Sequence, residues 1–141
     1  MRRYNLNEEI ENIDYWLEIV DKYKIKSEIY IEKARAVFES KKIKVSETNN
    51  NSFDFKFLGL DFIAKANISF NKESSKFNDG ELNIFHKKND DFELIISYSF
   101  DKIGNIENTF NTDTFALYFY VDFIKMVLNS STEKGIKFQL L

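Results

Sequence analysis

The most apolar stretch of the chain covers residues 112–129 of 141, and it constrains the fold more than any other stretch. After Asp113, only Asp122 and Lys125 carry charge within it. Read at 3.6 residues per turn, these two lie on one narrow polar stripe, and apolar side chains cover the rest of the circumference. A helix this apolar must be buried against a large surface such as a sheet face. We therefore predict a buried C-terminal helix over residues 112–130.

A second helical pattern fills residues 5–44, which contain neither Pro nor Gly. Asn5 or Asn7 can cap its start, with Glu8 in the capping-box position. Apolar residues recur at spacings of three and four, as in a heptad seam, and Ser27 is its one polar member. The seam comprises Ile13, Trp16, Val20, Tyr23, Ser27, Tyr30, Ala34 and Val37. Ile25 and Ile29 fall off the seam, which indicates either one long helix with a second apolar neighbour or a helical hairpin capped by Ser27.

Alternation with a period of two replaces the helical pattern over residues 52–109 and predicts an antiparallel meander of four or five strands. The expected strands cover residues 53–57, 60–70, 82–86 and 92–100, followed by a short one through Ile106. Polar segments predict turns or loops at 46–52, 71–80, 87–91 and 101–105. Gly59 shifts the alternation, which favours a bulge or bend over a tight hairpin.

The same alternation predicts which side chains face solvent. The expected outward positions are Asp54, Lys56, Lys65, Asn67, Glu93 and Ser97, and Phe92 and Leu94 are assigned to the core. A polar outer face argues against a nucleic-acid stacking platform, which needs exposed aromatic side chains. The alternating residues 136–140 predict a last edge strand or a tail that orders on a partner.

Helices and strands are segregated along the chain, which indicates a single α+β domain over residues 1–141 with its helices on one sheet face. Its expected parts are helical residues 5–44, a meander over 52–109, a helix over 112–130 and a tail over 131–141. Cysteine is absent, and the residues after Arg3 are polar where a secretion signal would be apolar. Asp122 and Lys125 would be costly inside a bilayer. We predict a cytoplasmic protein without a membrane partner.

Residues that could support catalysis are sparse. His86 is the only histidine, so a site with several histidine ligands is excluded. The four glycines stand apart and form no phosphate-binding loop. A formal net charge of −3 provides no general attraction for nucleic acid. We therefore expect no enzymatic activity, no cofactor, no metal and no direct nucleic-acid partner.

Charge is polarised along the first helical segment. Residues 8–21 hold six acids and no base, and bases dominate residues 22–44. The simpler interpretation is that the charges complement the helix dipole. The alternative is a docking surface, because an acidic helix face can bind a basic site on another protein. The candidate partner-binding residues are Glu8, Glu11, Asp14, Tyr15, Glu18 and Asp21.

This profile favours a small protein-binding module, of the stoichiometric inhibitor or immunity type, that docks on a basic partner. One alternative is a homo-oligomeric scaffold that pairs through the Ile13–Val37 seam. Another is a small-molecule or nucleotide-binding domain, since fifteen Phe and seven Tyr could leave an aromatic pocket between sheet and helices.

Overall fold

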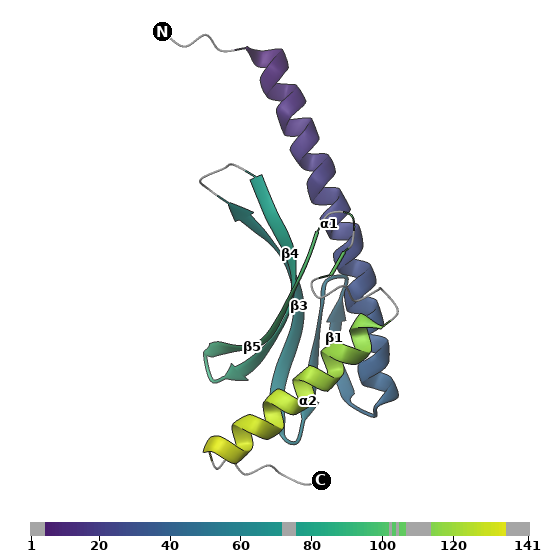
Figure 1. The fold of residues 1–141 in the computed structure, drawn as a ribbon, viewed down its shortest axis with the longest axis vertical. Coiled ribbons are helices and arrows are strands. Elements are labelled where there is room, and N and C mark those ends of the chain that lie inside the picture. Colours follow the sequence, from purple (N-terminus) through teal and green to yellow (C-terminus); the bar gives the residue numbers. More distant parts are fainter. Residues whose placement is uncertain (1–4, 72–75, 102, 104, 107–113, 135–141) are drawn as a thin grey trace.

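The computed structural model describes residues 5–71, 76–101, 103, 105–106 and 114–134, and it confirms the predicted α+β fold (Figure 1). In chain order the elements are α1 (Leu6–Ser40), β1 (Lys44–Asn49), β2 (Ser52–Phe57), β3 (Leu60–Asn71), β4 (Lys76–Lys88), β5 (Asp91–Phe100) and α2 (Phe115–Lys134). The sheet order is β1-β2-β3-β4-β5, so every strand pairs antiparallel with its neighbour in sequence.

The first helical segment forms one continuous helix and not a hairpin. Asn5 caps it, since its side-chain oxygen accepts a hydrogen bond from the Glu8 backbone N–H at 3.2 Å. The helix ends at Ser40, four residues earlier than predicted, and Lys42 takes a left-handed φ of 65° just beyond it. β1 follows directly. The sequence did not predict this strand because its residues are mostly polar.

Two turns are tighter than the sequence predicts. Phe57 pairs with Leu60, so Leu58 and Gly59 alone connect β2 and β3, with φ values of 51° and 81°. Positive φ at both positions is typical of a two-residue type I′ hairpin, and the interpretation of Gly59 as a bulge is wrong. The β4–β5 turn is equally short, because Lys88 pairs with Asp91.

A bulge in β5 places some side chains on the opposite sheet face from the one predicted. Ile84 pairs with Ile96 but Phe85 pairs with Leu94, so one extra residue reverses the alternation. Residues before the bulge therefore point to the opposite face from the one predicted. Phe92 and Leu94 lie on the outer face and are exposed, whereas Glu93 pairs with His86 on the helix-covered face.

Both helices cover the same face of the sheet, and aromatic rings fill the space between them. From α1, Phe38 contacts Phe55 at 5.0 Å between ring centroids, and from α2, Phe123 contacts Phe62 at 4.9 Å. Tyr30 lies where α1, the sheet and α2 meet, at 5.0 Å from the Phe115 ring. Burial, reinforced by the charge of Asp101, raises the pKa of its phenol.

The final helix is buried as predicted along one side, through Phe115, Ala116, Phe119, Phe123 and Val127. Its predicted polar stripe is only partly exposed to solvent, since the half-buried Asp122 accepts a hydrogen bond from the Tyr98 hydroxyl. The helix extends to Lys134, past the predicted end. Residues 111–113, whose Asn, Thr and Asp side chains could each cap this helix, lie outside the described residues, as do the alternating residues 136–140.

Gly80 in β4 is required by close packing. A Cβ atom at this position would lie 2.2 Å from Cζ of Phe100, whose ring is buried. Because that ring cannot move without displacing the core, we expect Gly80→Ala to lower the free energy of unfolding by about 1–3 kcal/mol. Urea denaturation followed by circular dichroism measures the change. An unchanged midpoint would contradict this packing.

Candidate protein-docking surface

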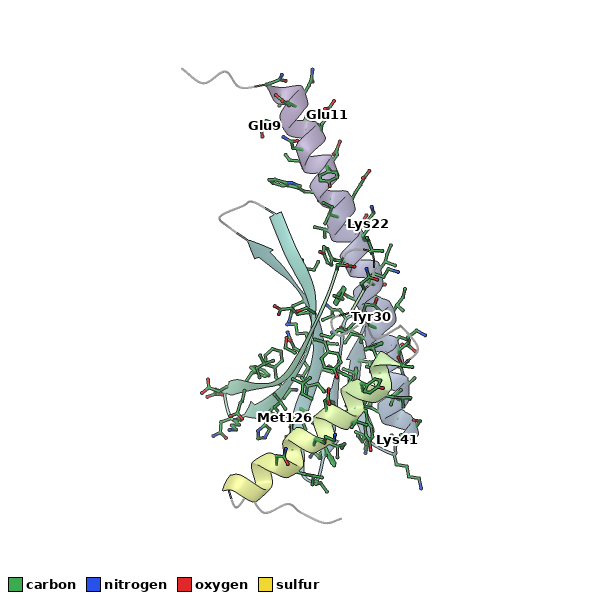
Figure 2. The ribbon with its side chains drawn as sticks, viewed as in Figure 1. Glu9, Glu11, Lys22, Tyr30, Lys41 and Met126 are labelled. Atoms are coloured by element: carbon green, nitrogen blue, oxygen red, sulfur yellow. The ribbon has the colours of Figure 1, made fainter. Side chains whose placement is uncertain are left out.

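The first part of α1 extends beyond the sheet (Figure 1). We call residues 6–21 the arm; at 1.5 Å per residue it is about 24 Å long. Every arm residue except Glu9, Ile19 and Val20 is exposed, whereas the first fully buried residue of the helix is Tyr23. Figure 2 shows Glu9 and Glu11 at the free end of the helix and Tyr30 beside the sheet. A helix this short is marginal alone, so continuity with the packed part and the Asn5 cap stabilise the arm.

One side of the arm is an exposed apolar stripe formed by Leu6, Ile10, Ile13, Trp16 and Leu17. Exposed fractions are 59% for Leu6, 50% for Ile13 and 57% for Leu17. At 100° per residue, these positions continue the face that carries Ile31 and Phe38 into the core. The apolar face of α1 therefore continues along the helix beyond the residues that are buried in the core. Contiguous apolar surface of this kind marks an interaction site.

The opposite side of the arm carries the predicted partner-binding residues. Glu8, Glu11, Asp14, Tyr15, Glu18 and Asp21 are all exposed, and the helix brings them together on one acidic face. No ion pair joins any of these acids to a described residue. Sequence reasoning identified this face. It missed the apolar stripe, because it assigned the whole seam to buried packing or to self-association.

The structure leaves only part of the predicted homodimer seam accessible to a second copy. Tyr23, Ser27, Tyr30 and Ala34 are buried in their own domain, so they are not available to a second copy. Only Ile13 and Trp16 of the seam remain exposed, and both belong to the apolar stripe. Any self-association through this seam would have to use its exposed arm residues, Ile13 and Trp16.

The described residues contain no group of three or more acids or histidines that could hold a metal ion. His86 packs its ring 5.1 Å from that of Phe62 at the edge of the core. Among the same residues, neither helix is long and apolar enough to cross a membrane.

The cavity nearest the arm is separate from the aromatic core, where the sequence predicted a pocket. Phe38, Phe55 and Phe123 lie 5.0 to 5.8 Å apart by ring centroids and fill the space between sheet and helices. A cavity opens instead where the arm meets the sheet, and none of the described residues that line it is aromatic.

The outer sheet face is a second surface with exposed apolar groups. Phe92 contacts Phe85 there, with ring centroids 6.3 Å apart. Two of its lysines are paired, since Lys87 lies 2.5 Å from Asp54 and Lys56 lies 3.7 Å from Asp61, whereas the exposed Lys65 forms no ion pair with a described residue. The exposed rings remove one argument against nucleic-acid binding, but a net charge of −3 still provides no general attraction for nucleic acid.

The chain matches no protein-family model, no curated protein and no solved structure.

Proposed function

We propose that this protein is a protein-binding module, of the stoichiometric antagonist type, that docks on a basic partner through the arm. The observation that carries the proposal is that the arm exposes an apolar stripe and an acidic face together. An amphipathic helix of this form binds by laying its apolar side into a groove of another protein. The partner surface that fits is an apolar groove with basic residues on its rim.

Charge favours a different protein over a second copy of this chain. Each arm carries six acids and no base over residues 8–21. Pairing two apolar stripes would bring Asp14 and Asp21, which flank the stripe, close to the same acids of the other arm. Like charges placed side by side destabilise a helix pair, whereas a basic rim would be attracted and would associate faster. Sedimentation of the purified protein should accordingly show a monomer.

Charge reversal tests the acidic face. We expect Glu11→Lys, Asp14→Lys and Glu18→Lys together to weaken partner binding by about 10-fold to 100-fold, because attraction becomes repulsion. The experiment compares proteins captured from the native host by the wild type and by the variant, quantified by mass spectrometry at rising salt. The wild-type complex should weaken with salt, as exposed ion pairs do.

A matched control carries the same change in charge elsewhere. Asp61→Lys, Asp90→Lys and Asp91→Lys alter three exposed acids on the sheet and its turns, away from the arm. This control should retain the partner. If both triple variants lose the same protein equally, net charge and not the arm is responsible, and the proposal is wrong.

A further inference from the structure

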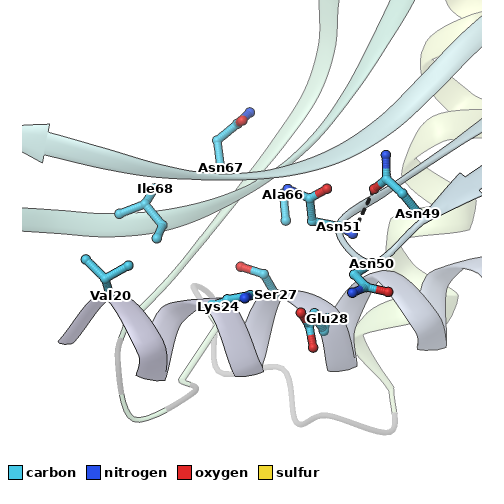
Figure 3. Close-up of a pocket in the computed structure, with 10 residues that line it drawn as sticks. All are labelled: Val20, Lys24, Ser27, Glu28, Asn49, Asn50, Asn51, Ala66, Asn67 and Ile68. Carbon is cyan, nitrogen blue, oxygen red and sulfur yellow. Dashed lines mark hydrogen bonds between the residues drawn. The ribbon is translucent and has the colours of Figure 1, made fainter. Parts of the chain in front are cut away.

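The cavity at the base of the arm lies between α1, the β1–β2 turn and β3 (Figure 3). Its volume is about 550 Å³, within the range of small-molecule sites. It goes beyond the docking surface, since the arm acids do not line it. The lining residues are Val20, Lys24, Ser27, Glu28, Asn49, Asn50, Asn51, Ala66, Asn67 and Ile68.

One part of the cavity is apolar. Val20 projects from α1 toward Ile68 of β3, and Ala66 lies one pleat further along the same strand (Figure 3). All three side chains are at least half-buried. This part can receive an apolar group of a ligand.

The β1–β2 turn forms a fixed polar wall. The Asn49 side-chain oxygen accepts hydrogen bonds from the Asn51 backbone N–H and from the Ser52 hydroxyl, both at 3.0 Å. The Ala66 N–H donates to the Asn51 carbonyl at 2.9 Å, which ties the turn to β3. The side-chain amides of Asn50 and Asn51 make no hydrogen bond to a described residue. They are therefore available to donate to and accept from a ligand.

Two opposite charges complete the lining. Lys24 at the rim and the half-buried Glu28 stand four residues apart on α1, and neither forms an ion pair with a described residue. Further along the same helix Arg35 does pair, with Glu39 at 2.9 Å and with Glu32. Among the described lining residues the cavity thus holds one cation and one anion, neither of them paired with a described residue.

We propose that this cavity binds a small zwitterion with an apolar side chain, which is the chemistry of a free amino acid. The ligand carboxylate faces Lys24 and its ammonium faces Glu28. Its side chain packs on Val20, Ala66 and Ile68, and its remaining polar atoms meet the amides of the turn. This inference does not depend on the docking function of the arm.

The experiment titrates the purified full chain with L-leucine, L-phenylalanine and L-methionine and follows backbone amide resonances by NMR. We expect saturable shifts at Val20, Ser27 and Ala66 with at least one of the three. The matching methyl ester and the N-acetyl derivative each lack one charge, so each should bind at least about tenfold more weakly, a loss of about 1.4 kcal/mol.

Two variants test the charges. Lys24→Met and Glu28→Gln should each weaken binding at least about tenfold, whereas Lys22→Met, on the exposed side of the same helix, should not. Neither position is in the core, so folding should persist, and the spectrum reports it directly. The proposal is overturned if no amino acid causes saturable shifts at about 10 mM, or if esters and acids bind equally well.

Discussion

Replacing Phe38 with alanine should lower the free energy of unfolding by about 3–5 kcal/mol, the usual cost of truncating a fully buried phenylalanine. Phe38 is 0% exposed and its ring contacts rings from both β2 and α2. The truncation therefore opens a cavity where three elements meet. Domains have only about 5–15 kcal/mol of stability in total, so the variant should be partly unfolded at 37 °C.

Urea denaturation followed by circular dichroism measures this loss, and Phe92→Ala provides the control. Phe92 is 61% exposed on the outer face, so its removal should cost less than about 1 kcal/mol. The sequence pattern placed Phe92 in the core, and the bulge in β5 moves it to the outer face. Equal losses for the two variants would mean that the bulge, and the outer face it creates, are wrong.

The second large effect concerns the apolar stripe. Ile13→Asp with Leu17→Asp should abolish partner binding, with a loss of about 100-fold or more, because buried apolar anchors dominate the energy of an interface. Both side chains are at least half exposed in the free protein, so stability should change little. Affinity capture from the native host measures the loss, and thermal unfolding verifies the fold.

The matched control is Leu117→Asp with Val121→Asp. These residues also lie four apart on one helix, and their exposed fractions are 47% and 40%. They belong to α2, on the other side of the domain core from the arm's free end. The control pair should keep the partner. If it loses the partner as completely as the stripe variant, general surface apolarity and not the arm explains binding.

Most of the fold could be predicted because its periodicities are strong. The helical seam through Tyr23, Tyr30 and Ala34 and the alternation through Phe53 and Phe55 each match one buried face. β1 was missed because it is a polar edge strand with little alternation. On the outer face, only Phe92, Glu93 and Leu94 were misassigned, because an extra residue at Ile95 reverses the alternation before it. No residue type in the sequence indicates that bulge.

The candidate site was predicted only on its acidic side. Glu11, Asp14 and Glu18 could be placed together from helical spacing alone. The apolar stripe could not be separated from the core, because Ile13 and Ala34 belong to the same seam although one is exposed and the other buried. The length of the helix was one indication that part of it would lie outside the core. A helix of 35 residues is about 52 Å long at 1.5 Å per residue, more than the 12-residue β3 can cover.

Site-specific photocrosslinking in the native host tests the docking role of the arm most directly. A benzophenone amino acid is placed at Ile13 in the stripe and, as a control of similar exposure, at Leu117. We predict that one protein crosslinks from Ile13, is absent from Leu117 and is lost when Glu11, Asp14 and Glu18 are changed to lysine. The contrary result is no crosslinked protein from Ile13, or the same protein from both positions regardless of the arm's charge.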